Sequence, residues 1–427
     1  MKEQNKMGFW GIVLLGINGI IGSGIFLLPS NGYKLFGPAS ALTLVFDGLL
    51  ALSIALCFAE CSGLFEENGG PLVYTTQAFG NFVGFEVGFV TWAIRIIAEG
   101  TIYVGFATAL AGIFPALNST LAKNVIVTIL AVFLAALNIS GVRNTSVANN
   151  IITVAKLVPI LMVAIIGVFA IHAANFHPFF IPKLTTSSNF ANASMTMFYI
   201  FTGFESLTVA ASEMKNPERN LPRAMILTMT AVVIIYLLVM VACIGVLGAQ
   251  LTNSTVPLQD TLKKVVGPWG GTVVAIGTLL SIGGICIGSS FVTPRSGSAL
   301  AEHKMMPAVL SKRNAKNAPY VAIIVSTTIS LLLAYSGTFN TLAQISAVSR
   351  FAQYIPTCLA VIVFRRTRPN QERVFKLPLG WTIPIMAVIV SLWLLFKTPV
   401  VNLIWGLGAL VIAVPFYFLM KHQNSSL

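Results

Sequence analysis

Residues 11–29, GIVLLGINGIIGSGIFLLP, form an apolar stretch whose middle is crowded with small residues. About 20 apolar residues are enough for a helix that crosses a membrane. The glycines in the middle of this stretch are Gly16, Gly19, Gly22 and Gly24. Glycine at this density weakens a helix because it loses the most backbone freedom on folding. The stretch therefore predicts either close packing by a neighbouring helix or a span that is unwound at its midpoint, where free N–H groups can bind an anion.

The composition of the whole chain places it in a membrane. Of its 427 residues, 56% are hydrophobic and 9% are charged, whereas about 25% of the residues of a soluble domain are charged. The mean hydropathy is +0.85. These values exclude an ordinary cytosolic enzyme and a disordered chain. The net charge of +13 comes from short loops between apolar segments and not from a nucleic-acid-binding motif, so we expect no nucleic acid partner.

The sequence contains twelve apolar segments that we interpret as transmembrane helices. They lie near residues 8–28, 39–63, 81–112, 123–140, 147–171, 192–212, 222–248, 268–294, 319–336, 341–364, 380–397 and 400–420. Seventeen of the 26 Lys and Arg residues fall in one set of alternating loops and six fall in the other. Positive loops stay in the cytoplasm. We therefore predict a multi-pass protein of the plasma membrane, or of the inner membrane of a bacterial cell, with both termini cytoplasmic.

The sixth segment has the second feature that suggests an interrupted helix. Within residues 191–224, ANASMTMFYIFTGFESLTVAASEMKNPERNLPRA, Gly203 lies at mid-span and Glu205 follows two residues later. Interruptions at corresponding positions of two halves indicate the binding site of a transporter. If five spans form one repeat, the sixth begins an inverted second repeat. This reasoning divides the chain into residues 1–172, 191–364, a final pair of helices at 380–420, and a cytoplasmic tail at 421–427.

Three motifs carry a resemblance to a known family. IIGSGIF (20–26), followed by LLPSNGYKLFGPAS (27–40), resembles the first-helix signature of the amino acid–polyamine–organocation superfamily. FTGFES (201–206) with SEMKNPERNLPRA (212–224) resembles its sixth helix and the loop that follows. FAECSGLFEENGGPLVYTTQAFG (58–80) is similar to the end of its second helix and the start of its third. The resemblance implies an all-α LeuT-type fold of 12 helices, a 5+5 inverted repeat in which helices 1 and 6 are broken.

The resemblance also implies where an amino acid would bind. Its carboxylate would meet amides of the first break, and its ammonium would meet carbonyls near both breaks. The substrate-binding residues expected in this way are Ile20, Gly22, Ser23, Gly24, Ile25, Tyr199, Thr202 and Gly203. The Tyr199 side chain matches a position where a bulky aromatic closes over substrate, although a tyrosine whose hydroxyl anchors the bundle is the alternative.

Lys156 lies in the middle of the fifth span, where a lysine without a partner costs several kcal/mol. Its side chain cannot comfortably reach the loop, about nine residues away. The resemblance implies that its ammonium takes the place of sodium between helices 1 and 8, bonded to first-span carbonyls and to a hydroxyl of Ser289 or Ser290. Whether such a lysine carries a proton or keeps a fixed charge is left open by the sequence.

Other charges inside the spans have two interpretations each. Arg95 and Glu99 are spaced i, i+4 and are expected to pair, and the alternative is that Glu99 faces the site and reads a cationic side chain. Glu205 and Arg350 form a candidate gate pair that closes the outer side of the pathway. The alternative for these two is that Arg350 satisfies backbone carbonyls while Glu205 caps the broken sixth helix.

These features favour a secondary transporter over other membrane proteins. The spans contain no enzyme constellation, no channel filter and no nucleotide-binding loop. We predict a sodium-independent exchanger of neutral L-amino acids that works by alternating access, without metal or cofactor, in contact with the lipid bilayer; a monomer is the simplest assembly. Proton symport and the antiport of cationic amino acids or polyamines are the alternatives.

Overall fold

The computed structural model describes residues 8–65, 70–141, 146–205, 207, 214–373 and 375–425. Every regular element found in these residues is an α-helix or a short 3-10 helix, written α and η, and no strand is present among them. The first part of the chain contains α1 (Phe9–Ile20), α2 (Ser23–Leu27), α3 (Pro29–Phe36), η2 (Gly37–Ser40), α4 (Ala41–Ser62), α5 (Pro71–Phe79), α6 (Asn81–Ile113), η3 (Pro115–Leu117), α7 (Thr120–Ile139) and α8 (Ser146–Phe169).

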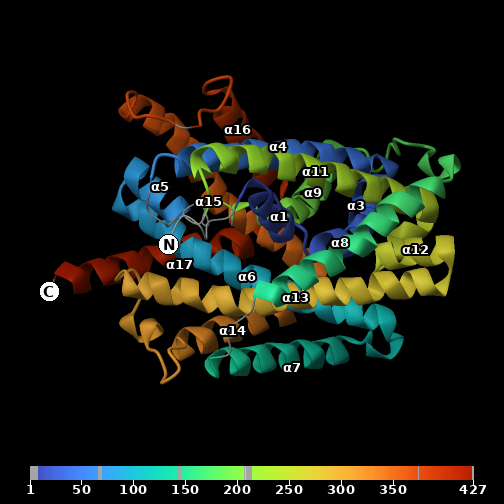
Figure 1. Cartoon of the computed structure of the whole chain (residues 1–427), viewed down its shortest axis with the longest axis horizontal. Helices are drawn as coiled ribbons and strands as arrows, with labels where there is room; N and C mark the ends of the chain where they lie inside the picture. Colours follow the sequence, from blue (N-terminus) through green and yellow to red (C-terminus); the bar gives the residue numbers. More distant parts are fainter. Residues whose placement is uncertain are drawn as a thin grey trace.

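The second part of the chain is helical in the same way. It contains η4 (Ala173–Phe176), α9 (Ser187–Met197), η5 (Phe198–Phe201), α11 (Pro217–Leu247), η7 (Gly248–Asn253), α12 (Pro257–Val266), α13 (Pro268–Glu302), η8 (Ala308–Ser311), α14 (Tyr320–Tyr335), α15 (Phe339–Thr367), α16 (Thr382–Lys397) and α17 (Val400–Ser425). The long helices run side by side along one axis, with α5 and the C-terminal end of α17 at one end of the bundle and α12 at the other (Figure 1).

Seven helical segments of the described chain are long and apolar enough to cross a membrane. Four further apolar helices are shorter, and they coincide with the predicted first, fifth, ninth and eleventh spans. The sixth predicted span is divided between α9, η5 and the residues that follow. The all-helical, apolar architecture is therefore confirmed for the described residues, and seven of their helical segments are long and apolar enough to cross a membrane.

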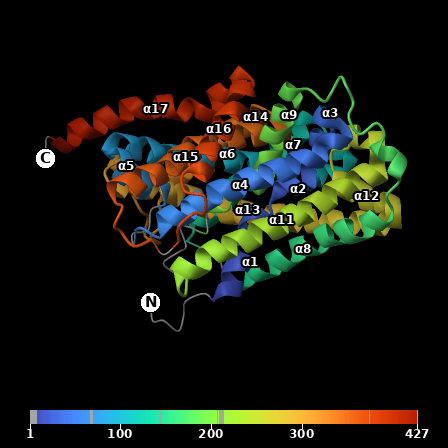
Figure 2. The ribbon, with the colours of Figure 1, turned by 90° about the horizontal axis from the view of Figure 1, so that it is seen from above.

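The helices differ in how much of their surface the bundle covers. In α6, 72% of the most apolar window is buried, whereas α7 and α17 each bury 17%. α6 packs against α13 and α15, and α11 packs against α1, α4 and α8. α7 and α17 lie at the outside of the bundle (Figures 1 and 2). Peripheral helices with exposed side chains such as Leu121 and Phe133 suit contact with lipid rather than with water.

The first predicted span is broken at its centre. α1 ends at Ile20, and Ile21 has extended backbone with φ −70° and ψ 103°. Gly22 is also extended, with φ −129° and ψ −158°, and α2 starts at Ser23. The interpretation as an unwound span is confirmed. The glycine cluster also predicts non-helical backbone at Ser23 and Gly24; this is wrong, because the break falls on the two residues before them and α2 begins at Ser23.

The sixth predicted span is interrupted as well. α9 tightens into η5, Thr202 is extended with φ −72° and ψ 153°, and Glu205 is helical again. Gly203 has φ +112°, a backbone conformation that side chains disfavour. A Cβ added there would lie 2.2 Å from the carbonyl oxygen of Gly19. The two breaks therefore touch each other, and only glycine allows this approach.

Candidate functional site

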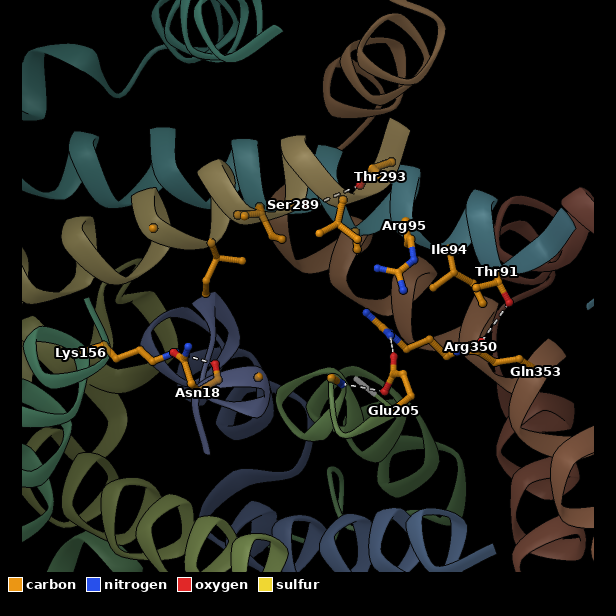
Figure 3. A pocket seen from close by; sticks show the side chains of 18 residues that line it. Asn18, Thr91, Ile94, Arg95, Lys156, Glu205, Ser289, Thr293, Arg350 and Gln353 are labelled. Atoms are coloured by element: carbon orange, nitrogen blue, oxygen red, sulfur yellow. Dashed lines mark hydrogen bonds and ion pairs between the residues drawn. The ribbon is translucent and has the colours of Figure 1, made fainter. Parts of the chain in front are cut away.

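A cavity of about 370 Å³ lies beside the two breaks. It is bounded by residues of α1, α6, α8, α13 and α15 together with the residues that follow η5. Its described lining residues are Asn18, Gly19, Thr91, Ile94, Arg95, Ala98, Ile102, Lys156, Gly203, Glu205, Gly284, Ile285, Gly288, Ser289, Val292, Thr293, Arg350 and Gln353. Figure 3 shows Lys156 beside Asn18 on one side of the cavity, and Arg95, Arg350 and Glu205 on the other.

Lys156 connects α8 to the break in α1. Its Nζ donates hydrogen bonds to the carbonyl oxygens of Asn18 at 2.6 Å and Ile21 at 2.8 Å. The residue is only 1% exposed. Carbonyls at the end of a helix lack intrahelical partners and can accept hydrogen bonds from a cation. The resemblance implied such a contact between Lys156 and carbonyls of the first span.

The serine hydroxyls expected to assist Lys156 have other partners. Ser289 lines the same cavity, but its Oγ lies 3.4 Å from the hydroxyl of Thr293. The Ser290 hydroxyl donates to the carbonyl of Ile287 and accepts from the Asn138 side chain at 3.1 Å. The contact of Lys156 with the first span is therefore present in the structure, while no hydrogen bond joins Lys156 to a hydroxyl of α13 among the described residues.

Ser23 and Tyr199 meet where the two broken spans adjoin. The Ser23 Oγ and the Tyr199 hydroxyl are 3.2 Å apart. A Cβ on Gly24 would lie 2.8 Å from Ile200 and 2.9 Å from the Tyr199 ring. Gly24 is therefore small so that η5 can approach α2. Ile25, 0% exposed, packs in the same core.

The carbonyl groups expected to receive an ammonium already have partners. The Tyr199 carbonyl accepts from the amide of Thr202 at 3.2 Å and from its hydroxyl at 2.8 Å. The Ile20 carbonyl accepts a long hydrogen bond of 3.4 Å from Tyr236. Neither Ser23, Gly24, Ile25, Tyr199 nor Thr202 is among the described lining residues of the cavity. The structure thus brings the predicted residues together but buries most of them next to the cavity rather than in its wall.

Glu205 is held from three directions. Its carboxylate forms an ion pair with Arg350 and accepts a hydrogen bond from the Tyr354 hydroxyl at 3.1 Å. The Gly203 amide donates to the same carboxylate at 3.0 Å. The Glu205 carboxylate therefore pairs with Arg350 and also accepts from the backbone amide that precedes the resumed helix. Tyr354 was not singled out from the sequence, although its position one helical turn after Arg350 was a usable signal.

Arg95 and Glu99 do not form the expected local pair. Glu99, 0% exposed, accepts a 2.5 Å hydrogen bond from Tyr103, and Arg95 instead points toward Arg350 and Glu205 (Figure 3). The i, i+4 spacing permits a pair, but the two side chains turn to different neighbours. Glu99 also lies outside the described cavity lining, so this structure does not place it where it could read a substrate side chain.

Comparison with known proteins agrees with this geometry. A family model described as amino acid permease matches residues 7–420. The chain belongs to the amino acid permease family. It is therefore a multi-pass membrane protein of a transporter family, and an amino acid is the substrate of such a permease.

Three relatives cover nearly the whole chain. An uncharacterized transporter of Mycobacterium tuberculosis is 31% identical over 91% of this chain and 87% of its own. The serine/threonine exchanger SteT of Bacillus subtilis is 28% identical over 99% of this chain and 98% of its own. The branched-chain amino acid permease BcaP of Bacillus subtilis is 26% identical over 99% of this chain and 94% of its own. The two with named substrates take uncharged amino acids.

Proposed function

We propose that this permease is a sodium-independent exchanger of L-amino acids, neutral ones above all. It would work by alternating access around the two touching breaks. The contact of Lys156 with the carbonyls of Asn18 and Ile21 is the observation that carries the proposal. A fixed ammonium at this place supplies the positive charge that a metal cation would otherwise bring to the broken helix.

The proposed architecture is the LeuT-type arrangement of 12 helices. Residues 1–172 and 191–364 would form two inverted five-helix repeats, and residues 380–420 would supply the last two helices. The distribution of cations supports cytoplasmic termini. Broken α1/α2 and the interrupted sixth span occupy corresponding positions in the two repeats.

The substrate carboxylate would meet the backbone amides of Ser23, Gly24 and Ile25 at the start of α2. The ammonium would lie between the carbonyls of Ile20 and Tyr199, with Gly22, Thr202 and Gly203 forming the adjacent backbone. Because Tyr199 and Ser23 now close on each other at 3.2 Å, substrate entry would require their hydroxyls to part. Glu205 and Arg350 would then act as a gate pair that is closed in this conformation.

Proton-coupled symport is the second candidate. It is favoured by the same lysine, because the Lys156 ammonium is almost fully buried and bonded to carbonyls that carry no charge. Symport would require this ammonium to release and rebind a proton in each transport cycle. Antiport of cationic amino acids or polyamines is less well supported, because the one carboxylate among the described lining residues, Glu205, is already paired.

Counterflow in proteoliposomes tests these alternatives. Purified protein would be reconstituted with unlabelled neutral amino acid inside and labelled amino acid outside, in sodium-free buffer. We expect internal substrate to accelerate uptake severalfold, with no change when sodium is added and no net proton entry. Uptake that needs no internal substrate and acidifies the lumen would establish symport instead, and indifference to internal substrate together with no proton entry would contradict both.

A further inference from the structure

The charges that line the cavity do not balance. Arg95, Lys156 and Arg350 contribute three cationic side chains, and Glu205 is the one anionic side chain among the described lining residues. A zwitterionic amino acid carries no net charge and leaves this excess unchanged. Uncompensated cations in a low-dielectric bundle are costly, so the cavity is suited to a ligand that brings additional negative charge.

Two of the three cations already have partners. The ammonium of Lys156 donates hydrogen bonds to the carbonyls of Asn18 and Ile21. Arg350 forms an ion pair with Glu205, and the second carboxylate oxygen of Glu205 accepts from Tyr354 and Gly203. Glu205 therefore has little remaining capacity for a second guanidinium.

Arg95 is the cation that these contacts leave over. In the described part of the chain its side chain makes no hydrogen bond and no ion pair, and its Nε is buried. The Nε of Arg350 likewise has no acceptor among the described residues. Figure 3 shows the Arg95 guanidinium pointing from α6 toward that of Arg350. Two neighbouring guanidinium groups with unused donors are a suitable receptor for a carboxylate, which arginine binds through parallel hydrogen bonds.

We propose that Arg95, assisted by Arg350, binds the side-chain carboxylate of an acidic L-amino acid. The proposal rests on the proposed function, because it assumes that an amino acid enters this cavity. It extends the substrate class from neutral amino acids to glutamate and its analogues.

The shape of the cavity favours glutamate over aspartate. The lining runs along α6 from Arg95 to Ile102, which is about 10 Å at 1.5 Å per residue. Ile102 lies one turn before Gly105, whose added Cβ would be 3.5 Å from the Ser23 side chain. For a substrate with its α-carboxylate near Ser23, a longer side chain brings the second carboxylate closer to Arg95, which favours glutamate. Ile94, Ala98 and Ile285 provide an apolar wall for its methylene groups.

Competition by glutamate and glutamine tests the proposal, because the two differ by a carboxylate against an amide of the same shape. Labelled serine counterflow into proteoliposomes would be measured against L-glutamate, L-aspartate and L-glutamine. We expect glutamate to compete at least as well as glutamine, and aspartate to compete about tenfold less well than glutamate. In Arg95→Gln the glutamate-to-glutamine ratio should fall at least tenfold, and Arg95→Lys should restore part of it.

A control variant and a binding measurement distinguish an effect at the cavity from a general loss of folding. Arg366→Gln removes a cation from the exposed end of α15, outside the cavity, and should leave the ratio unchanged. Thermal-shift titration of each detergent-purified variant with glutamine and glutamate separates lost binding from lost folding. Serine and glutamine exchange without any effect of glutamate would overturn the acidic-substrate proposal and leave the proposed function standing. If no amino acid is exchanged, the proposed function fails as well.

Discussion

The two helix breaks reach the same result by different means. The break after α1 is stabilised from outside its own segment, because Lys156 of α8 donates to the carbonyl of Asn18 in the last turn of α1 and to that of Ile21 at the break. The break in the sixth span is stabilised locally, because Glu205 accepts from the Gly203 amide two residues earlier. The difference teaches that an interrupted helix needs a partner of opposite polarity at each free end: a cation for carbonyls and an anion for amides.

Removing the ammonium tests the first half of this comparison and should have the largest effect. Lys156→Met removes a buried donor from the carbonyls of Asn18 and Ile21, and each lost hydrogen bond costs about 1–3 kcal/mol. We expect exchange to fall by about 100-fold or more, with normal membrane insertion. Uptake per inserted protein measures this, with the exposed loop variant Lys183→Met as the control. Wild-type uptake in Lys156→Met would mean that the lysine does not support the break.

Disrupting the contact between the two breaks should have the second-largest effect on exchange. In Gly203→Ala the new Cβ meets the Gly19 carbonyl oxygen at 2.2 Å, at a φ of +112°. Strain of about 1–3 kcal/mol is expected from the backbone alone, and exchange should fall about 30-fold with a lower thermal unfolding temperature. Gly22→Ala should be tolerated, because its φ is −129° and the nearest atom to its Cβ is 3.5 Å away.

Gly408→Ala is a neutral control for both, since nothing lies within 4 Å of its added Cβ. Equal damage from Gly22→Ala and Gly203→Ala would contradict the distinction between a break that tolerates a side chain and one that excludes it.

These contrasts show what the sequence could predict. Both breaks could be located because glycine and charge within an apolar stretch are local signals, visible without any neighbour. The exact residues at the first break could not, because Gly22 and Gly24 look alike in the sequence, and packing by Tyr199 and Ile200 decides that Gly24 stays helical. The orientation of Arg95 was missed for the same reason: the i, i+4 rule considers its own helix, while the arginine points toward Arg350 of α15.

Disrupting the ion pair between Glu205 and Arg350 should slow exchange less than Gly203→Ala does. Glu205→Arg or Arg350→Glu alone places like charges together, and we expect about tenfold slower exchange for each. The double variant restores opposite charges and should be faster than either single one. A coupling free energy above about 0.5 kcal/mol from the exchange rates would show that the residues act as a pair. A double variant no better than the worse single one would mean that Arg350 and Glu205 act independently.

The smallest effect is expected where the two broken spans meet through neutral groups. Ser23→Ala and Tyr199→Phe each remove one side of a 3.2 Å hydroxyl contact, and a neutral hydrogen bond contributes about 0.5–1.5 kcal/mol. If this contact only closes the site, both variants should shift exchange two- to tenfold and the double variant should add nothing further. If the Ser23 hydroxyl also binds the substrate carboxylate, Ser23→Ala should raise the KM for serine more than Tyr199→Phe does. Measuring KM and maximal rate for all three variants separates the two roles, and a fully additive double variant would show that the hydroxyl contact itself stabilises nothing.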